Sequence, residues 1–390
     1  MNHISQRVEN LAASATLAML QKTNELRAAG VDVIGMSAGE PDFNTPDFIK
    51  EAAKRAIDEN YSRYTPVAGY LSLRKAVCDK LKRENGLEYT PDQIVVGNGA
   101  KQELCNALLA LVNPGDEVII PVPAWVSYVE MVKLAEGKPV TVETLPENDF
   151  KITPEQLRAA ITGKSRVLML NSPCNPSGCV YSAEELEALA AVLREYPEII
   201  VLSDEIYEHI NFVGNVTSIA TFPGMIERTV VINGVSKAYA MTGWRIGYMA
   251  APTAIAKAVT KLQGQYTSGA SSIAQKAAEA AYTGPQQCLE EMNAAFRRRS
   301  ELIYDLALTI PGWETRRPQG AFYLFVKTPW EDSEKFCAYA RDNHDLLLVP
   351  SDSFGVKGYM RISYCVSYEM IKRSLPEFKK LAEETMNMDS

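Results

Sequence analysis

The chain has 390 residues, of which 46% are hydrophobic and 23% are charged, and its formal net charge is -8. This length favours two or three domains, and the composition excludes long disordered stretches. The negative charge makes nucleic acid and anionic membrane surfaces poor partners. The sequence contains no run of about 18 apolar residues, the length that is needed to span a bilayer. Glu9 and other polar residues interrupt the opening segment, which therefore does not resemble a signal peptide. We expect a cytoplasmic protein without nucleic-acid or membrane partners.

From about residue 90, short β-branched runs alternate with longer helical patterns. The predicted strands are 94–96, 117–121, 166–170, 198–202, 229–233 and 244–250. The predicted helices between them are 101–112, 127–135 and one that begins at Ser182. Continuous apolar strands separated by helices indicate an α/β fold with a mostly parallel sheet that is covered on both faces.

The helix at Ser182 carries a capping box, because Glu185 stands at its third position and can bond back to the cap. This start signal places the loop 171–181 between a strand end and a helix start.

The last hundred residues differ in character from the alternating region. A long charged helix is predicted over 290–308, and strand-like pieces follow at 321–326 and 359–365. We interpret them as a smaller α+β domain. The predicted organisation is an N-terminal segment that joins the small domain, a large domain, and a small C-terminal domain, with bounds 1–45, 46–285 and 286–390.

The seven cysteines are an odd number scattered along the chain, which is typical of reduced thiols. The closest pair, Cys174 and Cys179, has no second pair and no nearby histidine. We therefore expect no metal site.

Four predicted strand ends carry polar groups, and ligands of open α/β sheets bind at such ends. The groups are a glycine-rich turn at 97–101, an amide cluster at 171–178, Asp204 with Tyr207, and Ser236 with Lys237. Each has an ordinary structural explanation: a tight turn, a helix cap or a solvated lysine. A dinucleotide fingerprint at the turn is disfavoured, because Gln102 stands where the third glycine is required.

A functional interpretation uses all four groups at once. A helix N-terminus favours a phosphate, and a desolvated lysine is a nucleophile. Arg245 follows Lys237 by eight residues and could clamp a phosphate or form a surface ion pair. A phosphate, an aldehyde, a ring nitrogen and a phenolic oxygen together describe pyridoxal 5'-phosphate.

At this point the chain resembles the class I aminotransferases, which are pyridoxal-phosphate enzymes of fold type I. The resemblance covers nearly the whole chain, and the matching stretches are SAGEPDF (37–43), SRYTPVAGYLSLRKAV (62–77), AWVSY (124–128), NSPCNPSG (171–178), SDEIYEH (203–209), SKAYAMTGWRIGY (236–248), GAFY (320–323) and MRISY (360–364). It is strongest with the prokaryotic branch of aspartate and aspartate/prephenate enzymes. It implies a large domain with a mostly parallel seven-stranded sheet and a smaller α+β domain.

The resemblance also implies roles for individual residues. Lys237 would bind the cofactor covalently and shuttle the substrate proton, Asp204 would pair with the ring nitrogen, and Tyr207 would contact the phenolic oxygen. The other cofactor contacts implied are Gly99, Ala100, Lys101, Trp125, Asn175, Ser236, Arg245 and, from the neighbouring subunit of a homodimer, Tyr64. The substrate contacts implied are Gly39, Trp125, Asn175, Arg361, Lys101 and Thr16, with Arg361 on the α-carboxylate and Lys101 and Thr16 on a distal carboxylate.

The expected activity is transfer of an amino group from aspartate or glutamate to a 2-oxo acid by a ping-pong mechanism. Prephenate or aromatic substrates, and a carbon–sulfur lyase on the same cofactor, are the alternatives. A ligand-sensing regulator is disfavoured, because only about 40 residues precede the sheet domain. Cys174 and Ala124 depart from the usual residues of the family, and we expect both to lie beside the substrate and to affect selectivity.

Overall fold

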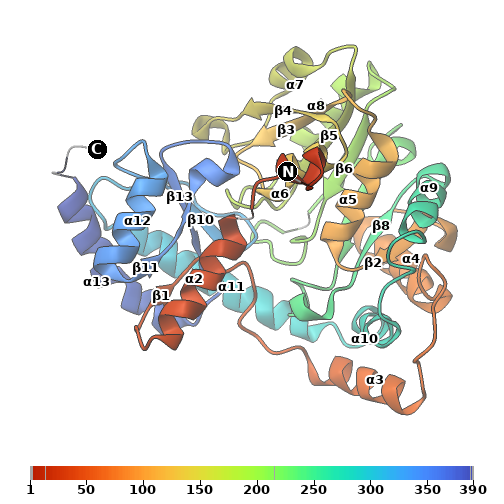
Figure 1. Ribbon diagram of the computed structural model, residues 1–390, viewed down its shortest axis with the longest axis horizontal. Coiled ribbons are helices and arrows are strands. Elements are labelled where there is room, and N and C mark those ends of the chain that lie inside the picture. The colour runs from red at the N-terminus through yellow and green to blue at the C-terminus, as the bar shows by residue number, and fades with distance from the viewer. Residues whose placement is uncertain (1–2, 14, 215, 387, 389–390) are drawn as a thin grey trace.

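The computed structural model describes residues 3–13, 15–214, 216–386 and 388. A seven-stranded sheet forms its centre, with the strand order β2-β8-β7-β6-β5-β3-β4 (Figure 1). The strands are β2 (Ile94–Gly97), β3 (Glu117–Val122), β4 (Lys138–Glu143), β5 (Ser165–Asn171), β6 (Ile200–Asp204), β7 (Thr229–Gly234) and β8 (Gly247–Ala250). Neighbouring strands are parallel, except that β8 runs antiparallel to β2 and β7. The predicted mostly parallel seven-stranded sheet is confirmed.

Two strands differ from the sequence pattern. The predicted strand 244–250 is wrong in its first part, because Arg245 adopts a left-handed conformation with φ of 58° and the extended chain begins only at Gly247. The strand β4 was not identified among the apolar runs. It lies at the edge of the sheet, and its residues alternate between exposed and partly buried, so it shows no continuous apolar run.

Helices cover both faces of the sheet, as predicted. Alternate residues of a strand point to opposite faces, and the core divides accordingly. Val118 and Val167 pack in one cluster with helices α5 (Ala100–Leu111), α6 (Ser127–Leu134) and α9 (Thr253–Gln263). Ile119 and Leu168 pack in another cluster with α7 (Pro154–Ala160) and α8 (Ala183–Arg194). The strands β2 and β8 share a third cluster with α3 (Asp47–Asp58), α4 (Leu71–Asn85) and α10 (Ser272–Thr283).

The predicted capping box at Ser182 is confirmed. The Glu185 backbone N–H donates to Ser182 Oγ at 3.2 Å, and the Ser182 backbone N–H donates to Glu185 Oε2 at 2.7 Å. The helix α8 therefore begins directly after the loop 171–181, which holds that loop at the end of β5.

A four-stranded antiparallel sheet forms from the C-terminal part of the chain, in the order β12-β13-β10-β9. Its strands are β9 (Glu314–Thr315), β10 (Tyr323–Lys327), β12 (Val349–Pro350) and β13 (Tyr359–Ser363), and the helices around it are α11 (Gln287–Ala307), α12 (Ser333–His344) and α13 (Tyr368–Thr385). Near the N-terminus follow α1 (Gln6–Glu9), α2 (Ala15–Ala28) and β1 (Ile34–Gly35), and β1 pairs in parallel with β11 (Leu346–Leu347). The domain bounds at residues 45 and 285 stay a prediction. Within the described ranges, no helix is both long and apolar enough to cross a membrane.

The first turn of α5 contains a fully buried carboxyl group, Glu103, and burial raises its pKa to about 8. In the unfolded chain this group titrates near 4.5, so between about pH 4.5 and 8 the folded protein binds the extra proton. Stability therefore falls by up to about 1.4 kcal/mol per pH unit over this range and levels off above it. Glu103→Gln should raise the urea midpoint at pH 9 and leave it nearly unchanged at pH 4.5.

Urea unfolding of the wild type and of Glu103→Gln at pH 4.5 and pH 9 measures the difference between their midpoints. The exposed Glu301→Gln on α11 serves as the control and should have no effect at either pH. Equal shifts for Glu103→Gln at pH 4.5 and pH 9 would show that Glu103 is not the titrating group.

Candidate active site

A cavity of about 420 Å³ lies beyond the carboxyl ends of the parallel strands. The register brings these ends together, because Asn171 at the end of β5 pairs with Asp204, and Asp204 pairs with Ile232 of β7. Eleven of the residues proposed from the sequence line this cavity: Gly39, Ala100, Lys101, Trp125, Asn175, Asp204, Tyr207, Ser236, Lys237, Arg245 and Arg361. They come from segments up to about 320 positions apart, so tertiary folding brings them together.

Of the three other proposed residues, Gly99 and Tyr64 do not line the cavity, and the assignment of Thr16 stays a prediction. Gly99 directly precedes α5 with φ of 85°, and a Cβ there would lie 2.5 Å from Arg245 Nη2, so only glycine fits. Tyr64 is 96% exposed and lies outside the cavity. Thr16 falls within α2, and its side chain lies outside the described residues.

One end of the cavity is built for an anion. Ala100 and Lys101 are the first two residues of α5, and the first N–H groups of a helix have no acceptor inside it. The Arg245 guanidinium is held beside them, since Nη1 donates to the Thr242 carbonyl at 2.7 Å and Nη2 to the Asn98 carbonyl at 3.1 Å. Ser236 adds a buried hydroxyl to this group. Together they suit a phosphate dianion.

The carboxylate of Asp204 is buried at the cavity wall. Burial raises its pKa to about 6, although Tyr128 OH donates to Oδ2 at 2.7 Å and the Ile206 N–H donates to Oδ1 at 3.2 Å. Among the described residues, no lysine, arginine or histidine forms an ion pair with it within 4 Å. A buried carboxylate of this kind is stabilised by a cationic ligand, and the cavity leaves room for one.

The Lys237 amine lies in the same cavity and donates to the Gly39 carbonyl at 2.6 Å. Burial lowers the pKa of Lys237 to about 8, and the charges of Arg245 and Arg361 act in the same direction. About a tenth of the amine is then neutral at pH 7, far more than for an ordinary lysine, and this neutral form is a nucleophile and a base.

The guanidinium of Arg361 is buried, with an exposed fraction of 1%. Its Nη1 donates to Asn175 Oδ1 at 2.9 Å, and its Nη2 donates to the Ser37 carbonyl at 2.7 Å. The group packs 4.4 Å from the centre of the Tyr323 ring. Its Nε has no hydrogen-bond partner among the described residues, and no described carboxylate lies within ion-pair distance of this arginine. A buried cation without a counterion favours a ligand carboxylate.

Tyr128, Asn171 and Tyr323 are among the further residues that line the cavity without having been assigned a role from the sequence. Tyr128 holds Asp204, Asn171 Oδ1 accepts from the Asn175 N–H at 2.8 Å, and the Tyr323 hydroxyl bonds the Tyr207 hydroxyl at 2.7 Å. The spacing of Tyr128 three residues after Trp125, at the start of a helix, could have indicated that both side chains share one face. Tyr323 ends the matching stretch GAFY, but its partner Tyr207 lies in the turn after β6, so only folding brings the two hydroxyls together.

The Lys101 side chain lines the cavity and is exposed. Its ammonium lies 5.2 Å from the centre of the Trp125 ring, and burial followed by the charge of Arg245 lowers its pKa. Lys101 and Trp125 also line a second cavity of about 530 Å³. Lys101 therefore presents a cation to both cavities.

The expectation that Cys174 and Ala124 lie beside the substrate needs correction. Neither lines the main cavity; both line a small neighbouring cavity of about 20 Å³ behind Tyr128 and Asn171, and Ala124 also lines the second cavity. Both side chains are buried, and a hydrogen bond from the Cys179 thiol lowers the pKa of Cys174. They reach the cavity only through their neighbours, because the side chain of the next residue, Asn175 or Trp125, faces it.

A parallel α/β sheet whose strand ends enclose a lysine, a carboxylate and two guanidinium groups defines an enzyme that binds small anionic ligands. The comparisons with known proteins specify the kind of enzyme. Residues 31–376 match the family model for aminotransferase class I and II. The chain therefore belongs to this family, and it is an aminotransferase.

Relatives and solved structures agree over the full length. The aspartate/prephenate aminotransferase of Nitrosomonas europaea is 46% identical, with 97% of this chain and 99% of the relative covered. The aspartate aminotransferase of Bacillus subtilis is 45% identical, with 98% and 99% covered. The crystal structure of the aspartate aminotransferase of Rhizobium meliloti superposes with a TM-score of 0.94 at 40% identity, covering 98% of this chain and 99% of that one. The enzyme of Thermus thermophilus with maleate gives 0.94 at 41% identity, covering 98% and 100%.

Proposed function

We propose that this chain is a pyridoxal 5'-phosphate-dependent aminotransferase that moves the amino group of aspartate or glutamate to a 2-oxo acid. The observation that carries the proposal is the arrangement of Lys237, Asp204 and Arg361 around one cavity. The Lys237 amine, with its lowered pKa, can react with an electrophile. The buried Asp204 carboxylate has no cationic partner among the described residues, and the buried Arg361 guanidinium has no anionic one. The cofactor and an amino acid substrate together supply all three partners.

The residues present fit the cofactor. The start of α5 with Ser236 and Arg245 would hold the phosphate, and Asp204 would hold the ring nitrogen as a cation. The Tyr207 hydroxyl and Asn175 would contact the phenolic oxygen, and Trp125 would stack on the ring. When bound, pyridoxal 5'-phosphate supplies an aldehyde that condenses with amines and a ring that accepts the electrons left when a proton departs.

The protein's own groups divide the remaining work. Arg361 holds the substrate α-carboxylate through its planar fork and thereby orients the Cα–H bond. Lys237 Nζ, part of which is neutral near neutral pH, would take the Cα proton of the substrate and hold it for the return transfer. Asp204, held by Tyr128, keeps a negative charge where the ring nitrogen needs it. Because the enzyme keeps the amino group after the first product leaves and before the second substrate binds, we expect ping-pong kinetics.

A half-reaction tests this activity. Aspartate added to the loaded protein without any 2-oxo acid should yield oxaloacetate in an amount equal to the active sites, with one change in cofactor absorbance. Continuous release of pyruvate and ammonia without an acceptor would instead support a lyase on the same cofactor.

A preference for acidic substrates is supported by Lys101, whose ammonium lies beside Trp125 in the lining of the cavity. The similar enzyme of Thermus thermophilus was solved with maleate, a dicarboxylate. Lys101→Ala should lower kcat/KM for aspartate about tenfold, because a charge-assisted hydrogen bond is lost at a partly exposed site. The reaction with phenylalanine, which has no distal carboxylate, should change little. Equal changes with both substrates would remove Lys101 from distal recognition, and Thr16 would remain as the proposed contact.

Prephenate is the second candidate substrate. The relative from Nitrosomonas europaea is named as an aspartate/prephenate aminotransferase. The second cavity, which shares Lys101 and Trp125 with the first, gives a bulkier substrate room. Turnover with prephenate as the acceptor in a coupled assay distinguishes the broad from the narrow specificity.

We further propose a homodimer in the cytoplasm. The Tyr64 side chain is 96% exposed in the single chain, and the family resemblance assigns it to the phosphate site of a neighbouring subunit. The seven cysteines are free thiols, as expected in a reducing compartment. Sedimentation equilibrium of the loaded protein should give twice the chain mass, and a single-chain mass would contradict the dimer.

A further inference from the structure

A buried cluster of ionic side chains lies outside the lining of the cavity. Its centre is Glu208, which is 7% exposed, and its cation is Lys80, which is fully buried. Lys80 Nζ donates to Glu208 Oε1, and it also donates to Asn85 Oδ1 at 2.8 Å. The Asn233 amide donates to Glu208 Oε1 at 2.6 Å, and the Asn85 amide donates to Oε2 at 2.8 Å. The carboxylate is thus held by one ammonium and two amides.

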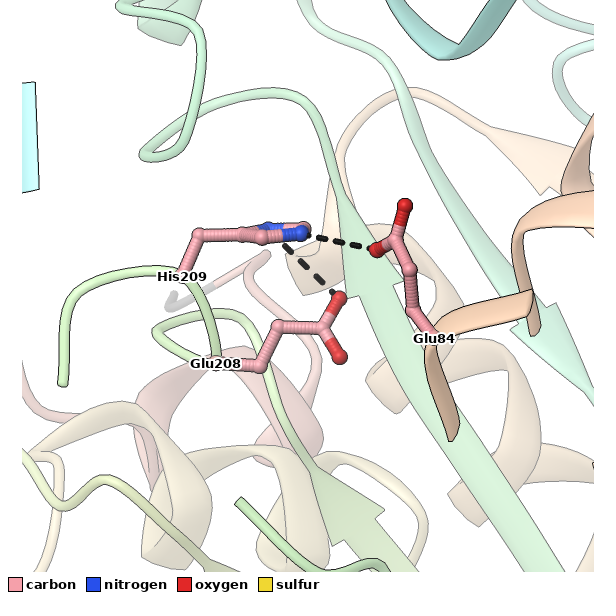
Figure 2. Close-up of side chains that lie close together, drawn as sticks. All are labelled: Glu84, Glu208 and His209. Atoms are coloured by element: carbon pink, nitrogen blue, oxygen red, sulfur yellow. Dashed lines mark hydrogen bonds and ion pairs between the residues drawn. The ribbon is translucent and has the colours of Figure 1, made fainter. Parts of the chain in front are cut away.

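The imidazole of His209 lies beside this cluster (Figure 2). Its Nε2 lies 2.9 Å from Glu84 Oε2 and its Nδ1 lies 3.6 Å from Glu208 Oε1, so the ring contacts both carboxylates. One atom of each of these residues lies within 4.8 Å of the others, a spacing that could suit a metal ion. The Lys80 ammonium, however, also lies 3.4 Å from Glu84 Oε2. The cation at this place is therefore the lysine, and a second cation beside it would be repelled.

The cluster connects helix α4 to two parts of the chain that bear residues of the active site. Lys80 and Asn85 belong to the end of α4, Glu208 directly follows Tyr207 in the turn after β6, and Asn233 lies at the end of β7, four residues before Lys237. Asn233 is itself fixed, because its Oδ1 accepts from the Gly234 N–H at 2.7 Å. A single carboxylate therefore joins the turn that bears Asp204 and Tyr207 to the strand end that leads to Lys237.

We propose that Glu208 is a positioning residue of the aminotransferase reaction: held by Lys80, it fixes the turn carrying Asp204 and Tyr207 against the strand end that leads to Lys237. This inference rests on the proposed function, because it assumes that those three side chains act on one cofactor. A shift of about 1 Å between reacting groups can cost about a hundredfold in rate, so such a connection has a direct kinetic consequence.

The charge state of the cluster supports this role. Burial alone would raise the pKa of Glu208, but the charge of Lys80 and the hydrogen bonds around the carboxylate lower it below its ordinary value. The carboxylate is therefore ionised throughout the neutral range, and its contacts with Lys80 and Asn233 persist when Lys237 changes its protonation state.

Two variants separate positioning from stability. Lys80→Met with Glu208→Leu removes both charges together, and replacing a buried ion pair by apolar groups of similar size is often neutral for stability. Asn233→Ala keeps the ion pair and removes the connection from Glu208 to β7, together with the acceptor of the Gly234 N–H. For both variants we expect kcat with aspartate to fall about 10- to 100-fold, while KM for aspartate changes less than about twofold because Arg361 is untouched. The pH midpoint of the cofactor absorbance, which reports the surroundings of Lys237, should also shift.

A matched control shows what stability alone does. Lys151 is another buried lysine, paired with Glu185 at 2.6 Å far from the cavity. Lys151→Met should lower the melting temperature and leave both kcat and the pH midpoint unchanged well below that temperature.

Normal kcat and a normal pH midpoint in Asn233→Ala would overturn the positioning role, even if the double variant failed to fold. A wild-type protein that releases no oxaloacetate from aspartate would instead overturn the proposed function. The two failures are therefore distinguishable.

Discussion

Lys237→Ala is expected to reduce turnover of aspartate by about 10⁴-fold, because one substitution removes both the nucleophile and the base. The Lys237 amine faces the cavity with a pKa lowered to about 8, and no other lysine except Lys101 lines that cavity among the described residues. Stopped-flow absorbance of the half-reaction and steady-state oxaloacetate release measure the loss.

The variant should still bind the cofactor non-covalently, since Ser236, Arg245 and the start of α5 are unchanged. A rise in the melting temperature of the variant when the cofactor is added would show that binding is kept and that only the chemistry is lost. Lys257→Ala, an exposed lysine of α9, is the control and should keep full activity. Turnover of Lys237→Ala within tenfold of the wild type would refute the assignment of this lysine.

Arg361→Lys is expected to lower kcat/KM for every amino acid substrate by about 10- to 100-fold. The planar fork of arginine bonds a carboxylate through two N–H groups, whereas lysine offers one compact charge, so at least one charge-assisted bond is lost. The loss should appear chiefly in KM, and it should be similar for aspartate and phenylalanine because both carry the α-carboxylate.

This common loss distinguishes Arg361 from Lys101, whose removal should affect aspartate alone. Arg341→Lys on α12 is the matched control, because that arginine pairs with the exposed Asp342 at 2.7 Å and lies away from the cavity. A variant Arg361→Lys with unchanged KM for both substrates would place the α-carboxylate elsewhere.

Local patterns predicted the strand ends well. Asp204, Ser236 and Lys237 each follow a buried β-branched run, and a parallel sheet places such ends at one edge. The start of α8 was equally readable, because the capping box of Ser182 and Glu185 involves only neighbouring residues. Burial and short-range hydrogen bonding therefore account for the sheet and for four of the groups around the cavity.

Other features depend on contacts that no local pattern contains. The edge strand β4 is half exposed, so it lacks an apolar run, and the left-handed conformation of Arg245 shortened the strand predicted around it. Tyr323 meets Tyr207 from a different sheet, and the partnership of Lys80 with Glu208 joins residues 128 positions apart. Hydrogen bonds across such distances arise only when the whole chain folds.

The amino-acid sequence alone determined the α/β class and the polar groups at the strand ends. Through the resemblance, it also indicated Lys237 as the lysine that binds the cofactor. The class and the strand-end groups follow from short-range rules of burial, periodicity and capping. The tertiary structure decided which of those groups face one cavity, which buried charges lack a partner, and that Cys174 and Ala124 lie behind the wall. The reason is physical: the pKa of Asp204 or Lys237 depends on desolvation and on charges brought close by folding, and neither exists in an extended chain.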